Sequence, residues 1–128
     1  MEGPKSREEK IEARLTNLRR MGKDYSAAKA EVTYLEEFKK SKLAILMKLA
    51  ESKGVTSAAG QERDARADGA YLEMLLGLRV AVEKAEALRW ELTVAQMGAE
   101  VWRTNQATRR IEMQMYGPDA KPKWSDDD

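Results

Sequence analysis

The chain of 128 residues contains no cysteine and no histidine. It therefore has no disulfide, no thiolate nucleophile, no imidazole base and no zinc site of the Cys/His kind. Helical di-metal centres pair their carboxylates with Glu-x-x-His, which needs a histidine, and the glycines form no phosphate-binding loop. We predict a protein that is not an enzyme and that holds no metal and no cofactor.

Long apolar runs are also missing. No segment approaches the ~18 apolar residues that a membrane span needs, and Met1–Lys10 lacks the apolar core of a signal peptide. Charged residues make up 35% of the chain. The composition predicts a soluble, cytoplasmic protein with no membrane partner.

Proline is confined to positions 4, 118 and 122. Because proline costs roughly 3 kcal/mol inside a helix, this distribution predicts a long helical body. The one dense cluster of helix breakers is Ser52–Gln61. Gly54 suits the position just after a helix end, and Thr56 or Ser57 can cap the start of a second helix. We predict two helices joined by a turn near residues 52–60.

Both predicted helices carry apolar residues at heptad spacing. In the first helix the two columns are Ile11, Leu18, Tyr25, Val32 and Leu46, and Met21, Ala28, Leu35 and Leu49, with exceptions at Arg14, Lys39 and Lys42. In the second helix they are Tyr71, Leu78, Ala85, Leu92, Ala99 and Met113, and Met74, Ala81, Leu88, Ala95 and Trp102. From these columns we choose eight residues as the predicted core or oligomer contacts: Tyr25, Val32, Leu35, Leu46, Leu78, Leu88, Leu92 and Trp102.

The predicted fold class is all-α, a long antiparallel helical hairpin of coiled-coil type over residues 7–116. Residues 1–6 are expected to fray, and residues 117–128, with two prolines and three terminal aspartates, to form a disordered acidic tail. Several apolar residues lie off the heptad columns: Phe38, Leu43, Ile45, Trp90, Val94 and Val101. Such surplus apolar side chains need a second surface to cover them, so we expect a homo-oligomer.

Positive charge is concentrated at two places along the predicted hairpin. If the chain reverses near residue 56, residues whose numbers sum to roughly 112–116 lie side by side. Arg103, Arg109 and Arg110 then share the open end with cations of the first helix, while Lys39, Lys40 and Lys42 lie nearer the turn. Clustered Lys and Arg bind backbone phosphates, and Trp102 could stack on a base. The competing explanations are that these cations simply face solvent on the helix surface and that Trp102 packs among apolar residues.

The second predicted helix contains the most distinctive segments of the sequence: Gln61-Glu-Arg-Asp-Ala65, Leu88-Arg-Trp-Glu-Leu92, Glu100-Val-Trp-Arg-Thr104 and Ala107-Thr-Arg-Arg-Ile-Glu-Met113. These segments are similar to small helical proteins that are common in phage genomes. Residues 25–113 also combine a helix with Glu36-Glu-Phe-Lys-Lys40, a glycine-containing turn and a second long helix with late basic residues. In this combination they resemble, more distantly, the UvsY-type recombination mediators of T-even phages.

The resemblance implies an oligomeric accessory protein that binds single-stranded DNA in the host cytoplasm. Such a protein helps to load a recombinase onto DNA covered by single-strand-binding protein, so both proteins are candidate partners. Only Lys39, Lys40 and Lys42 match the basic segment of the family; Arg103, Arg109 and Arg110 come from the charge geometry. The alternative is a helical module that binds a protein, such as an inhibitor of a host defence system or a structural adaptor.

Overall fold

The computed structural model describes Gly3 and residues 6–117 of the chain. These residues form three helices and no strand: α1 (Arg7–Ser52), α2 (Ala58–Ala67) and α3 (Gly69–Tyr116). The prediction of an all-α fold is confirmed. The tail predicted to be disordered lies outside the described residues from position 118 onward, as do positions 1, 2, 4 and 5 of the predicted frayed segment.

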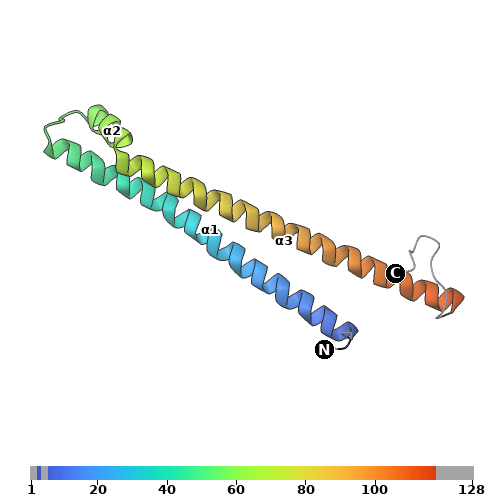
Figure 1. The fold of residues 1–128 in the computed structure, drawn as a ribbon. Helices are drawn as coiled ribbons and strands as arrows, with labels where there is room; N and C mark the ends of the chain where they lie inside the picture. Colours follow the sequence, from blue (N-terminus) through green and yellow to red (C-terminus); the bar gives the residue numbers. More distant parts are fainter. Residues whose placement is uncertain (1–2, 4–5, 118–128) are drawn as a thin grey trace.

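The two long helices lie side by side and run in opposite directions (Figure 1). At 1.5 Å per residue, α1 is ~69 Å long and α3 ~72 Å long. α2 is short and lies at the end where the chain reverses, and α3 extends past the start of α1 at the other end. None of the described helices has a stretch that is both long and apolar enough to span a bilayer.

α1 begins and ends at residues whose chemistry suits helix termini. Ser6 and Glu9 form a capping box, in which the Ser6 hydroxyl accepts from the Glu9 amide at 3.2 Å and the Ser6 amide donates to the Glu9 carboxylate at 3.3 Å. At the other end Gly54 has a φ of 101°, a conformation that favours glycine. The predicted helix end at this glycine is confirmed.

The predicted second helix is interrupted, which the heptad pattern did not anticipate. α2 ends and α3 begins at Asp68, which has extended backbone angles (φ −65°, ψ 137°). Its carboxylate accepts a hydrogen bond from the Ala70 amide at 2.8 Å, so it acts as the N-cap of α3. The break lets α2 fold back over α1 and close the turn end.

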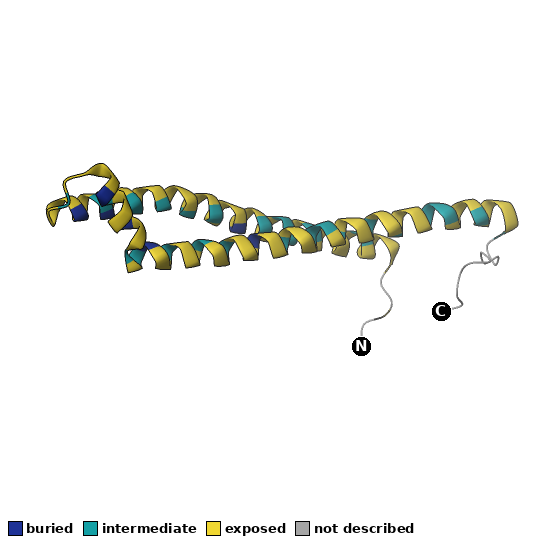
Figure 2. Cartoon of the chain, turned by 90° about the horizontal axis from the view of Figure 1, so that it is seen from above, coloured by how far each residue is buried: buried dark blue, intermediate teal, exposed yellow. Residues whose placement is uncertain are grey.

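Buried residues are concentrated at this turn end (Figure 2). The buried cluster consists of Leu46 from α1, Ala65 from α2 and Tyr71 from α3, with Leu43 and Met47 packed against it. Farther along the rod, Ala28 and Ala85 are the last buried hydrophobic residues, and no large side chain among the described residues is completely enclosed. Most of the molecule is therefore a two-helix seam with few deeply buried side chains.

Gly60 in α2 provides a test of the cap at the turn. Ser57 is the N-cap of α2, and its hydroxyl accepts from the Gly60 amide at 3.1 Å. A Cβ atom at position 60 would lie 2.8 Å from the Ser57 hydroxyl oxygen and 3.0 Å from Val55 Cγ1. We expect Gly60→Ala to lower the free energy of unfolding by about 1 kcal/mol, because it displaces the cap.

Gly22 is the matched control, since a Cβ there would meet nothing within 4 Å. Gly22→Ala should raise the free energy of unfolding by up to about 1 kcal/mol, because alanine favours helix more than glycine does. Urea unfolding followed by circular dichroism at one protein concentration measures both. Equal gains in the two variants would contradict the assigned role of the Ser57 cap.

Candidate nucleic-acid interface

The three lysines predicted to bind phosphate lie on α1 near the turn end. Lys39 and Lys42 are half-buried because they follow Val32 and Leu35 by one heptad and so occupy seam positions. Lysine stems commonly cover apolar surface in this way. Lys40 is exposed, and its ammonium group lies 3.1 Å from the Glu37 carboxylate. The structure thus leaves one of these lysines fully on the surface, next to a neutralising partner.

The three predicted arginines lie on the last turns of α3. Arg103, Arg109 and Arg110 are all exposed. The Arg103 guanidinium lies 2.7 Å from the Glu100 carboxylate. Such exposed pairs between neighbouring turns are weak, typically about 0.3–0.5 kcal/mol, so Arg103 can exchange its carboxylate for a phosphate.

Within one chain the lysines and the arginines lie far apart. Arg14 lies over Trp102, and Leu46 clusters with Tyr71, so residue numbers fall along α1 as they rise along α3. This register places Lys42 level with about residue 74 of α3, some 29 residues from Arg103. At 1.5 Å per residue the two groups are roughly 45 Å apart. They do not form one site in a single copy.

The arginines are accompanied by cations from the first turns of α1. These α1 residues are all exposed: Arg7, Lys10, Arg14, Arg19, Arg20 and Lys23. The carboxylates on the same turns are Glu8, Glu9, Glu12 and Asp24 of α1 and Glu100 and Glu112 of α3. We call the six α1 cations, with Arg103, Arg109 and Arg110, the open-end cluster. Among the described residues, Arg103 is its only member within ion-pair distance of a carboxylate.

Trp102 packs in the seam between the helices. Its ring is half-buried, and the Arg14 guanidinium carbon lies 5.3 Å from the ring centroid. A cation in this position occupies one face of the indole, so Trp102 is poorly placed to stack on a base. The other predicted core residues are also in the seam: Leu46 is buried, and Tyr25, Val32, Leu35, Leu78, Leu88 and Leu92 are half-buried.

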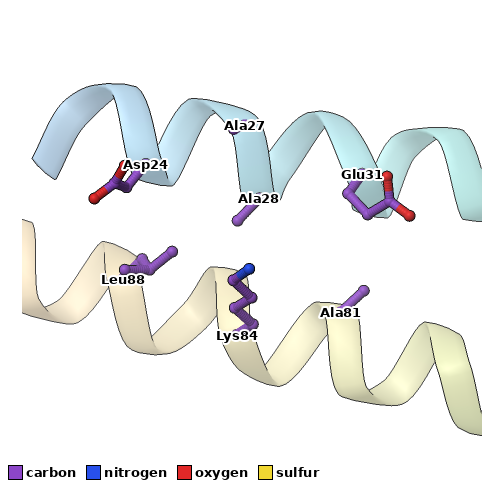
Figure 3. A pocket seen from close by; sticks show the side chains of 7 residues that line it. All are labelled: Asp24, Ala27, Ala28, Glu31, Ala81, Lys84 and Leu88. Carbon is purple, nitrogen blue, oxygen red and sulfur yellow. The ribbon is translucent and has the colours of Figure 1, made fainter. Parts of the chain in front are cut away.

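A groove of about 680 Å³ lies between α1 and α3 near the middle of the rod (Figure 3). Its floor is formed by small side chains, including Ala28 and Ala81, and its charged groups are Asp24, Glu31 and Lys84. Two carboxylates against one ammonium group repel phosphate. Within the described part of the chain, no three acidic side chains come close enough together to hold a metal ion.

The exposed apolar side chains form the feature that sequence reasoning found only in part. Trp90, Val94 and Val101 were recognised as lying off the heptad columns, and all three are exposed. Leu76, Val80 and Met97 are exposed as well and belong to the same side of α3. A search of the second predicted helix for another set of apolar residues at alternating spacings of three and four would have identified them.

The exposed cations and the exposed apolar side chains are suited to contact a partner through charge and apolar packing. No protein-family model, curated protein or solved structure matches the chain.

Proposed function

We propose that the chain is an oligomeric, non-enzymatic accessory protein that binds single-stranded DNA in phage recombination or replication. Its role would be of the recombination-mediator type, helping to load a recombinase in the cytoplasm of the host. The observation that carries the proposal is the open-end cluster, where exposed cations from both ends of the described chain meet.

The physical argument is electrostatic. A backbone that carries one phosphate per nucleotide binds where several cations replace its counterions, and the affinity falls as salt rises. In the open-end cluster, arginines dominate, and their planar guanidinium groups hold phosphate oxygens in pairs. The exposed Lys40, with the half-buried Lys39 and Lys42, provides a weaker second contact near the turn.

The test is a titration of a fluorescent single-stranded oligonucleotide, followed by anisotropy, at ~50 mM and ~200 mM salt. Replacing Arg103, Arg109 and Arg110 together with alanine should weaken binding at least tenfold and reduce the salt slope by about 2–3. Replacing Lys39, Lys40 and Lys42 should have a smaller effect, because two of the three are half-buried.

The matched control removes three other arginines, Arg63, Arg66 and Arg89, each of which lies beside a carboxylate on α2 or α3. This triple variant should bind as the parent does. Circular dichroism verifies that each variant remains helical. No binding at the lower salt would contradict DNA binding and leave the protein-binding module as the better explanation. Equal losses in all three variants would contradict the open-end cluster as the binding site.

A further inference from the structure

α3 carries a second apolar stripe on the side that faces away from α1. Its members recur at spacings of three and four residues, with Glu83 filling one position: Leu76, Val80, Ala87, Trp90, Val94, Met97 and Val101. We call this set the outer stripe. Trp90 and Val80 are each 64% exposed, whereas Tyr71 and Ala85 of the seam are 5% and 7% exposed. One helix thus has two apolar faces, of which the chain covers one.

The two faces of α3 lie nearly opposite each other. At about 100° per residue, the outer stripe lies roughly 160° from the seam. The corresponding outer side of α1 has one aromatic residue, Tyr34, which is 62% exposed. Its other members are polar or small: Arg20, Lys23, Ala27, Ala30, Glu37, Ser41, Ala44, Lys48 and Glu51. Only α3 therefore carries a continuous apolar stripe on both sides.

The single chain is also poorly enclosed. Among the described residues, six hydrophobic residues are buried and eighteen large hydrophobic side chains are exposed. A rod with so few enclosed side chains gains stability when an apolar face is covered. A second copy supplies an identical stripe of equal length, which suits a two-fold symmetric contact.

We propose that two copies dimerise through the outer stripe, with their α3 helices packed antiparallel. The two-fold axis lies between residues 88 and 89. Leu76 then faces Val101 of the partner subunit, and Val80 faces Met97 of the partner subunit. Trp90, the largest side chain of the stripe, faces Ala87 of the partner subunit, so large and small side chains interlock.

The charges that flank the outer stripe determine both the direction and the register. In the antiparallel dimer, Arg79, which lies 3.1 Å from Glu83 of its own chain, also lies beside Glu100 of the partner subunit. Lys84, which lines the groove in the single chain, would turn towards Glu91 of the partner subunit. A parallel dimer would instead bring Arg79 towards the partner's Lys84, and Glu86 towards the partner's Glu91. Opposite charges meet only in the antiparallel arrangement.

Other antiparallel registers are disfavoured in the same way. Moving one helix by a heptad in one direction places Glu91 against the partner's Glu91. Moving it in the other direction places Lys84 against the partner's Lys84. Like charges directly opposite each other destabilise a helix pair, so of these three registers the proposed one alone places no like charges opposite each other.

Two glycines within α3 fit this dimer. A Cβ at Gly77 or at Gly98 would meet nothing within 4 Å in the single chain, although glycine in a helix interior is less favourable than alanine. In the proposed register Gly77 flanks the stripe beside the partner's Gly98. Two small residues at this position let the helix backbones approach closely.

The dimer would bring together the two basic groups that one chain keeps apart. Lys39–Lys42 are level with about residue 74 of their own α3, which faces residue 103 of the partner subunit. The partner's Arg103 then lies at the level of the lysines, about two interhelical spacings or ~20 Å away. Each end of the dimer would offer phosphate contacts from both copies. This consequence rests on the proposed function, whereas dimerisation does not.

The first experiment measures self-association by sedimentation equilibrium without DNA. The parent chain should be dimeric at micromolar concentration. Glu83 faces Val94 of the partner subunit in this register, so the parent contact already contains two carboxylates. Val94→Glu with Met97→Glu should weaken the dimer at least about 100-fold, because four more carboxylates would be desolvated there, two of them opposite Glu83. The control, Tyr34→Glu with Ile45→Glu, alters two exposed apolar residues of α1 and should leave the dimer intact.

The second experiment tests direction by disulfide formation, which has no background because the chain lacks cysteine. Val80→Cys and Met97→Cys chains should cross-link when mixed, and neither should cross-link alone. Cross-linking of Val80→Cys with itself would indicate a parallel dimer. Charge reversal is a further check: Glu91→Lys should weaken the antiparallel dimer, and adding Lys84→Glu should restore it.

A monomeric parent chain, or a dimer unaffected by Val94→Glu with Met97→Glu, would overturn the inference. A dimer that binds no oligonucleotide would overturn the proposed function alone. A chain that binds oligonucleotide as a monomer would overturn this inference and the oligomeric part of the proposed function, but not DNA binding.

Discussion

Replacing Tyr71 with alanine is expected to lower the free energy of unfolding by about 3–4 kcal/mol, in the range of other buried aromatic truncations. Tyr71 is 5% exposed and belongs to the cluster that joins all three helices through Leu46 and Ala65. Few other side chains of the rod are enclosed, so little other packing remains to stabilise the hairpin once this cluster contains a cavity. Urea unfolding followed by circular dichroism measures the loss.

Tyr34→Ala is the matched control. This tyrosine is 62% exposed on α1 and stacks only on Phe38, with ring centroids 6.1 Å apart. Losing a pair of side chains one turn apart on a helix surface costs about 0.5 kcal/mol or less. Equal losses for the two tyrosines would show that the turn end is not the stability centre of the molecule.

Ala28→Glu is expected to destabilise the hairpin by about 3 kcal/mol or more. Ala28 is buried where α1 meets α3, and a larger side chain would push the helices apart. The new carboxylate would also lie in the groove between Asp24 and Glu31 (Figure 3). Burial of a charge and repulsion by two like charges both favour the separated helices. Lys84 offsets only part of this cost.

Ala30→Glu, two residues farther along α1, isolates the effect of position. Ala30 is exposed, so glutamate there remains hydrated, and its helix propensity is close to that of alanine. The change should be within about 0.5 kcal/mol. Because the chain is proposed to self-associate, both variants are compared at one protein concentration. Similar losses in the two variants would contradict the close approach of α1 and α3 at Ala28.

The proposed DNA binding and the proposed dimer use different side chains. The open-end cluster consists of exposed cations on the first turns of α1 and the last turns of α3. The outer stripe lies in the middle of α3 and contains no lysine or arginine. A variant can therefore lose one property and keep the other, which makes the two proposals separately testable.

The sequence alone determined the helical class and the seam. The absence of proline from residues 5–117 and the heptad columns require long helices, because local spacing decides which side chains share a helix face. The end of α1 at Gly54 and an N-cap at Thr56 or Ser57 were also readable, since these are local effects of φ angle and hydrogen bonding, and the structure shows that the cap is Ser57.

Only the tertiary structure decided which of the remaining residues are covered. In the sequence, Lys39 and Lys42 belong to a basic run. In the structure they are half-buried at seam positions, because α3 lies against that side of α1. In the sequence, Asp68 is one acidic residue among several. In the structure it separates α2 from α3, and α2 packs against Leu46 of α1. The spacing of the outer stripe is present in the sequence, but only the structure shows that α1 covers the opposite side of α3 and leaves this side exposed. Burial depends on contacts between residues distant in the chain, and local spacing does not contain that information.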